Sequence, residues 1–152
     1  MSGADEVQDI PMADQPAMMA ALNEQRKALG LQVWELEMNS GVSASAYFWW
    51  KSTDRSPAFG SIVAIAQVIG LATVLRHQSG RQHRIISAKD AMTFINAERR
   101  ARGMTFGDCE RESGVSASTY WPLLRGKREP RLATMVAIAA GLDFELVLKA
   151  TS

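Results

Sequence analysis

The segment Ser40-Gly41-Val42-Ser43-Ala44-Ser45 occurs twice in this chain, the second time as Ser113-Gly114-Val115-Ser116-Ala117-Ser118. Both copies belong to a longer repeat, because residues 22–75 align with residues 95–148 at a constant offset of 73 and without gaps. Of the 54 aligned pairs, 20 are identical, which unrelated segments do not reach in one fixed register. The chain is therefore a tandem duplication of one small unit.

Each copy predicts a series of short helices. In the second copy, Ser87 is placed to cap a helix that ends at Gly103, and a second helix follows over 105–112. Gly114 supplies the positive φ of a tight turn, and Ser116 caps a third helix. An apolar stretch after the Pro57 and Pro130 loops predicts a fourth helix in each copy.

The ends of the two copies leave two alternatives open. Phe144, Leu146 and Leu148 alternate with other residues at a period of two, and residues 71–75 occupy the matching positions. This pattern fits short paired strands, but a fifth helix is the other alternative. The polar composition of segment 76–84 predicts an exposed connector.

Two short helices joined by a glycine-containing turn form a helix-turn-helix unit. The second copy resembles the lambda-repressor-like, Cro/C1-type (XRE) family in Thr105, Ser113-Gly114-Val115-Ser116, Tyr120, Arg125-Gly126-Lys127-Arg128 and Pro130. The first copy keeps Leu36, Gly41-Val42-Ser43, Tyr47 and Pro57 but lacks the basic run. The resemblance implies a mainly all-α fold of two tandem helix-turn-helix domains, with a short β-strand after each as an option.

The domain boundaries follow from the repeat. We expect a flexible acidic N-terminus over 1–13, a first domain over 14–76, a linker over 77–86 and a second domain over 87–150. Residue Pro122 lies inside the third helix of the second copy, and we expect that helix to kink there or to begin late.

The resemblance implies binding to double-stranded DNA and regulation of transcription, often as a repressor. In that family the third helix lies in the major groove, and the N-terminus of the second helix lies near a phosphate. Two units in one chain can imitate the dimer that such domains form, as a pseudo-dimer spanning two half-sites. A further homodimer of the whole chain is compatible with this arrangement.

The candidate DNA-contacting residues are polar or aromatic side chains at the second and third helices. They are Ser43, Ser45 and Trp49 in the first copy, and Thr105, Ser116, Ser118, Thr119, Trp121, Arg125, Lys127 and Arg128 in the second. The base-reading faces of the third helices lack the Asn, Gln, Arg or Lys that give paired hydrogen bonds to bases. Their aromatic rings can instead touch thymine methyl groups, and the basic run can neutralise phosphates.

The same aromatic face supports an alternative, in which the chain is a protein-interaction module of helix-turn-helix fold. Phe48 and Trp49 point away from the predicted core side of the third helix, and exposed aromatic patches mark interfaces. Under this hypothesis the chain is an anti-activator or an antitoxin, and its partner is another regulatory protein.

Composition excludes several other classes. The formal net charge of +1 excludes a strongly basic, histone-like protein, and no apolar run approaches the ~18 residues that span a membrane. The single cysteine, Cys109, fits a reducing cytoplasm. The sequence carries no phosphate loop, metal-ligand motif or catalytic constellation, so we expect no enzyme, cofactor or metal site.

Overall fold

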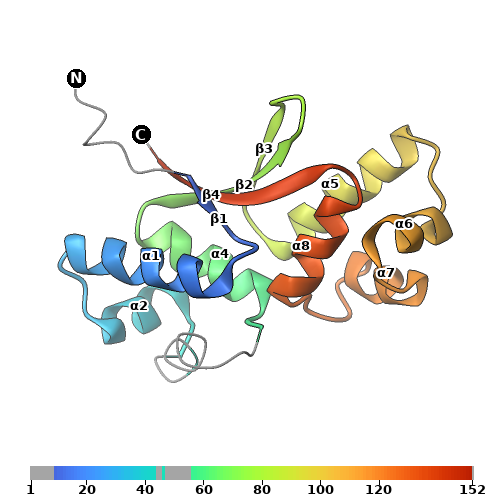
Figure 1. The fold of residues 1–152 in the computed structure, drawn as a ribbon. Coiled ribbons are helices and arrows are strands. Elements are labelled where there is room, and N and C mark those ends of the chain that lie inside the picture. The colour runs from blue at the N-terminus through green and yellow to red at the C-terminus, as the bar shows by residue number, and fades with distance from the viewer. Residues whose placement is uncertain (1–8, 44–45, 47–55, 152) are drawn as a thin grey trace.

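The computed structural model describes residues 9–43, 46 and 56–151, which form seven helices and four strands (Figure 1). The elements of the first unit (residues 10–77) are β1 (Ile10–Pro11), α1 (Gln15–Ala28), α2 (Val33–Ser40), α4 (Phe59–Val68) and β2 (Leu71–His77). Those of the second unit (residues 82–150) are β3 (Gln82–Ile85), α5 (Ala88–Ala101), α6 (Phe106–Ser113), α7 (Ala117–Leu124), α8 (Leu132–Ala140) and β4 (Phe144–Ala150).

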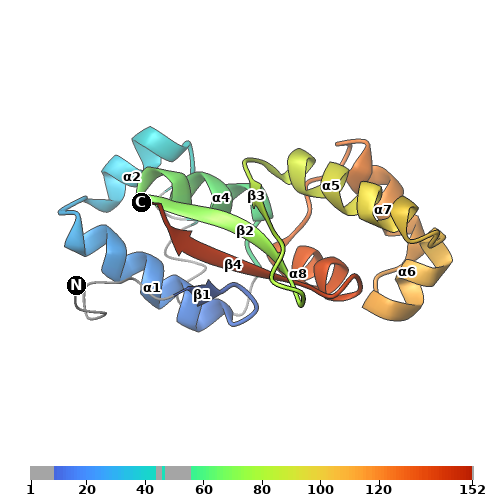
Figure 2. The same ribbon diagram turned by 90° about the horizontal axis from the view of Figure 1, so that it is seen from above.

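The prediction of a mainly all-α fold made of two tandem domains is wrong. All four strands form one antiparallel sheet in the order β1-β4-β2-β3, and the helices lie along one side of it, so the fold is mixed α and β (Figures 1 and 2). The residues after each fourth helix form strands, not a fifth helix. The segment 77–86, predicted as a linker, contains β3.

The sheet joins the two units through a pseudo-two-fold axis. Its central pair is β2–β4, one strand from each unit, and Val74 pairs there with Val147, its own equivalent in the repeat. Figure 2 shows these two strands crossing the centre of the molecule in opposite directions. A residue paired with its own repeat equivalent lies on the axis that relates the two copies, so the units are arranged as in a two-fold dimer.

The outer strands obey the same symmetry. Strand β1 of the first unit pairs with β4 of the second, with Ile10 opposite Leu148. Strand β3 of the second unit pairs with β2 of the first, with His83 opposite Leu75. Because each unit's first strand pairs with the other unit's last strand, neither unit completes its share of the sheet alone.

The two units also exchange a pair of backbone hydrogen bonds just before α4 and α8. The backbone N–H of Phe59 donates to the carbonyl of Pro130 over 2.9 Å, and that of Leu132 donates to Pro57 over 2.8 Å. The two prolines, identical in the aligned repeat, thus occupy equivalent places on either side of the axis.

Each unit also caps the other unit's fourth helix. The Ser56 hydroxyl accepts from the backbone N–H of Ala133 in α8 over 2.9 Å, and the Glu129 carboxylate accepts from Gly60 in α4 over 2.8 Å. Neither helix has a side-chain cap from its own N-cap residue, Ala58 or Arg131. The two units therefore satisfy one another's free helix-terminal N–H groups.

Identical residues of the repeat make identical contacts. In the first unit, Arg26 bonds to the side-chain oxygen of Asn23 and donates to the carbonyl of Leu31 over 2.6 Å. In the second unit, Arg99 bonds to Asn96 and donates to the carbonyl at position 104 over 2.7 Å. These bonds fix the turn between the first and second helices of each unit.

Candidate nucleic-acid interface

Helices α6 and α7 form a two-helix element joined by the turn 114–116. Gly114 has φ 76° and ends α6 in the left-handed region, where a residue with a Cβ is strained. Ser116 caps α7, and its hydroxyl accepts from the N–H of Ser118 over 3.3 Å. Helix α7 begins at Ala117 and runs through Pro122 to Leu124, so it does not begin late.

One serine holds this element together from inside. The Ser113 hydroxyl donates to the carbonyl of Cys109 over 2.7 Å and accepts from the N–H of Val115 over 3.0 Å. It also lies 2.9 Å from the hydroxyl of Tyr120, which is buried in α7. Burial raises the pKa values of both Tyr120 and the Cys109 thiol, so both side chains are neutral and serve the core.

The opposite side of α7 is open to solvent. Tyr120 and Leu123 face the core, whereas Ser118 is exposed and Trp121 is 50% exposed. Ser118, Trp121 and Arg125 stand at spacings of three and four residues, so they share one face of the helix. Thr119 is half-buried beside this face.

Trp121 is held at the surface by its neighbours. Its ring lies 5.4 Å from the ring of Phe106, which begins α6, and the Arg125 guanidinium lies 5.0 Å from the Trp121 ring centroid. The Arg99 guanidinium stacks over Phe106 at 4.2 Å. The indole is therefore supported on two sides and keeps one part of its surface free.

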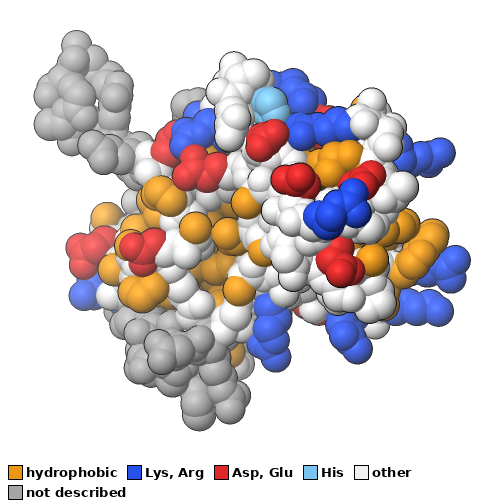
Figure 3. Space-filling view, turned by 45° about the vertical axis from the view of Figure 1, so that its right-hand side comes forward, with side chains coloured by type: hydrophobic (Ala, Val, Ile, Leu, Met, Phe, Trp, Pro, Cys, Tyr) orange, Lys and Arg blue, Asp and Glu red, His pale blue; other side chains and the backbone are white. Residues whose placement is uncertain are grey.

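A basic loop follows α7. Arg125, Lys127 and Arg128 are exposed, and Gly126 turns the backbone there with φ 73°. None of the three forms an ion pair with any residue that the structure describes. Figure 3 shows basic side chains projecting from the lower part of this side of the molecule. Arg131 behaves differently, because it donates to the carbonyl of Ser56.

One carboxylate accepts a backbone hydrogen bond at the start of each of the helices α6 and α7. Thr105 and Asp108 form a reciprocal capping box at α6, with bonds of 3.0 and 2.8 Å. The Glu110 carboxylate accepts from the first N–H of α7, that of Ala117, over 2.7 Å. Hydrogen bonds from Thr105, helped by Arg111, lower the pKa of Asp108. The Asp108 carboxylate lies at the helix end to which the resemblance assigns a phosphate.

The first unit presents less of its candidate surface. Ser43 is exposed and accepts from the N–H of Ala46 over 3.1 Å, in the position of Ser116. The predicted contact residues Ser45, Phe48 and Trp49 lie outside the described residues.

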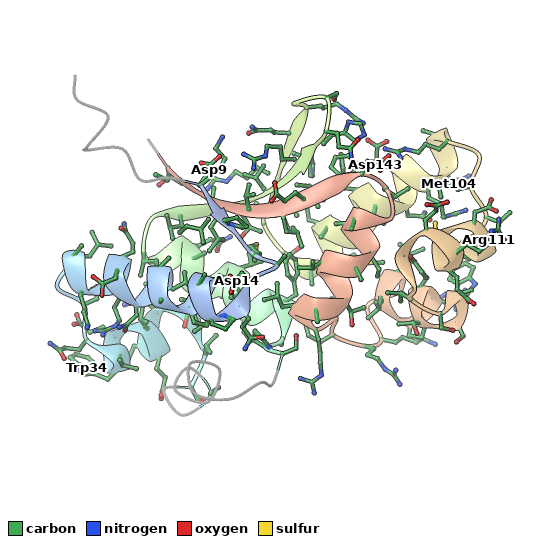
Figure 4. All side chains as sticks on the ribbon, viewed as in Figure 1. Asp9, Asp14, Trp34, Met104, Arg111 and Asp143 are labelled. Atoms are coloured by element: carbon green, nitrogen blue, oxygen red, sulfur yellow. The ribbon has the colours of Figure 1, made fainter. Side chains whose placement is uncertain are left out.

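The outer ends of the two units differ in chemistry. In the first unit, Trp34 and Met38 lie one turn apart on α2 and are 60% and 74% exposed. Their equivalents in the second unit are Gly107 and Arg111. Figure 4 labels Trp34 and Arg111, which lie at opposite ends of the molecule. The first unit therefore ends in an apolar patch and the second in a charged one.

Sequence reasoning missed several of these features. The Thr105–Asp108 spacing is a recognisable capping signal, so the occupied N-terminus of α6 could have been foreseen. Glu110 reaches Ala117 across the turn, and no local pattern signals that bond. Trp34 and Met38 are four residues apart and so share one face of α2, which is opposite the face of the buried Leu36.

Comparison of the chain with protein-family models, curated proteins and solved structures finds no match. Within the described ranges, no helix is long and apolar enough to cross a membrane. The same residues include no group of three or more His, Cys, Asp or Glu side chains placed to hold a metal ion.

Proposed function

We propose that this protein is a sequence-specific regulator of transcription that binds double-stranded DNA with its two units arranged as a pseudo-dimer. The observation that carries the proposal is the basic loop, whose three cations stand beside the exposed face of α7 without acidic partners among the described residues. Phosphate neutralisation supplies much of the affinity of proteins for DNA.

The pseudo-two-fold axis supports the same proposal. Duplex DNA presents the same groove in a two-fold arrangement about one helical turn, or about 34 Å, apart, and two-fold dimers exploit this spacing. The cross-paired strands and the hydrogen bonds around Pro57 and Pro130 relate the two units of this chain by a pseudo-two-fold axis. One chain can therefore serve where two chains are usual.

The occupied helix N-termini define how phosphates are bound in this proposal. The Asp108 carboxylate accepts from the N–H of Thr105, the N-cap residue of α6, and the Glu110 carboxylate accepts from the first N–H of α7, so in this proposal phosphate contact comes from side chains. We expect Arg125, Lys127 and Arg128, which follow the C-terminus of α7, to take that role, and Ser116 and Ser118 lie at the other end of the helix. The chain acts in this proposal by binding, without catalysis or a cofactor, in the cytoplasm.

The test is selection of fragmented genomic DNA by the purified protein over a series of salt concentrations. We expect a few fragments to be enriched, and Arg125→Ala with Lys127→Ala to lower the slope of log affinity against log salt by about 2. The charge-matched control is Arg84→Ala with Lys89→Ala, two exposed cations on β3 and at the start of α5. Equal slopes for both double variants would contradict the proposal.

A second candidate function, binding of a regulatory protein, is favoured by one observation. Trp34 and Met38 give the first unit an exposed apolar patch that the second unit lacks. A photo-crosslinking residue at position 38 is expected to capture that protein in cells, and one at the equivalent position 111 is not. Equal capture at both positions, or none at either, contradicts this candidate.

A further inference from the structure

The exposed face of α7 offers very little hydrogen-bonding chemistry to a base. Ser118 lies with its hydroxyl 2.8 Å from that of Ser116, so part of its capacity is used within the turn. Thr119 is half-buried, and Pro122 has neither an N–H nor a polar side chain. The largest free group on this face is the indole of Trp121, which is 50% exposed.

We infer that Trp121 is a specificity-determining residue that recognises the 5-methyl group of thymine in the major groove. This inference rests on the proposed function, since it names the feature of DNA that the α7 face reads. In the major groove, the thymine methyl is the apolar group that distinguishes one base pair from the others.

The surroundings of Trp121 favour DNA over an apolar protein surface as the occupant. The indole shares a shallow hollow with Pro122, Arg125 and Lys127, so apolar and cationic groups line the same concave surface. An apolar protein partner would have to bury those two cations, which is costly without paired charges. A thymine methyl flanked by phosphates meets both kinds of group.

The ring is also held ready for such a contact. Phe106 supports it on one side at 5.4 Å, and the Arg125 guanidinium lies over it at 5.0 Å. A side chain that is already ordered loses little conformational entropy on binding. Because the Arg125 guanidinium lies over the indole, its charge would stand near the phosphates of a base pair that Trp121 contacts.

The experiment compares one DNA fragment recovered by the selection, synthesised once with thymine and once with uracil throughout. Uracil pairs as thymine does but lacks the methyl group. We expect the wild-type protein to bind the thymine form more tightly, by roughly fourfold for each contacted methyl. Trp121→Ala is expected to bind both forms equally, with the salt dependence of the wild type.

The matched control is Trp34→Ala, which removes an exposed tryptophan from the other end of the molecule. It is expected to keep the preference for thymine. If Trp121→Ala does not fold, as judged by circular dichroism, Trp121→Gln replaces it, because glutamine keeps much of the side-chain bulk without the apolar ring.

The outcomes separate the inference from the function on which it rests. Equal binding of the two DNA forms by the wild type, or an unchanged preference in the Trp121 variant, overturns the inference and leaves DNA binding intact. Recovery of no fragment at any salt concentration overturns the proposed function, and the inference falls with it.

Discussion

At the scale of single residues, two carboxylates decide what the helix ends of the second unit are able to bind. Asp108 and Glu110 accept hydrogen bonds from the backbone at the starts of α6 and α7. A negative side chain is stabilised there because the helix dipole and the free N–H groups favour anions. The same groups repel a second anion, so in the proposed function the attraction of phosphates depends on the basic loop that follows α7.

The Asp108 carboxylate predicts an acid-sensitive contribution to stability. Its pKa is lowered in the folded protein, first by the backbone hydrogen bond from Thr105. A lowered folded-state pKa means that the contribution is fully present above the ordinary aspartate value of about 3.9. It is lost as the pH falls through the lowered value.

The measurement is the free energy of unfolding of the wild type and of Asp108→Asn between pH 7 and pH 3. We expect the wild type to be more stable at pH 6 and the difference to shrink towards pH 3. Glu112→Gln, which removes a nearby exposed carboxylate of α6, serves as the control. A difference that stays constant with pH would contradict the role of the ionised Asp108.

At the scale of elements, two glycines of the second unit carry opposite consequences. A Cβ on Gly141, at the end of α8, would stand 2.9 Å from the Cβ of Ser113 and 3.2 Å from its backbone nitrogen. Gly107 lies inside α6, and a Cβ there would meet only the Thr105 hydroxyl, at 3.6 Å. Neither glycine has a positive φ, so contact distances decide the effect of substitution.

We therefore expect Gly141→Ala to destabilise the protein by about 1–3 kcal/mol, since α8 must move away from the backbone of α6. Gly107→Ala is expected to stabilise it by about 0.4–1 kcal/mol, because alanine restricts the unfolded chain and the backbone at this position suits an L residue. Denaturant unfolding of the two variants measures both. Changes of the same sign would show that helix propensity, and not the α6–α8 contact, dominates.

The elements also show how far the sequence could be read. Helices and their caps depend on local signals, and the predicted caps Ser87 and Ser116 lie where the structure has them. The sheet depends on distant partners, and β1 has only two residues, Ile10 and Pro11, too few for any periodicity. Strand β3 lies in a polar segment in which only Ile85 is buried.

The candidate site divides in the same way. The turn at Gly114 and the basic run of residues 125–128 are visible in the sequence because each is continuous along the chain. The bond from Glu110 to Ala117 and the support of Trp121 by Phe106 join different helices. Such contacts depend on packing, and a single sequence carries no signal for them.

At the scale of the whole molecule, the duplication has produced a two-fold assembly inside one chain. The strands exchange partners between units, and Ser56 and Glu129 each cap a helix of the other unit. The contacts that would form the interface of a dimer are here contacts within a single core. We therefore expect that neither half folds independently as a monomer.

This arrangement predicts the behaviour of the second unit when it is expressed alone as residues 80–152. In this fragment the strand β4 lacks its partners β2 and β1. A second copy of the fragment can replace them with its own β4 and β3, which are their equivalents in the repeat, with the two Val147 residues opposite each other. We expect the fragment to form a dimer whose thermal midpoint rises with concentration. Light scattering and circular dichroism measure this, with the full chain as control. A folded monomer at all concentrations would contradict the exchange of strands.

The axis through Val74 and Val147 has a consequence for dosage. A binder made of two separate chains dissociates when the concentration of chains falls. Its effect therefore sets in only above a threshold abundance. A fused pair has no such assembly step. If the chain regulates transcription as proposed, every chain made is a complete binding unit, and the response scales with expression down to a few copies. Joined halves are also released from the need to match, so each can drift towards a surface of its own.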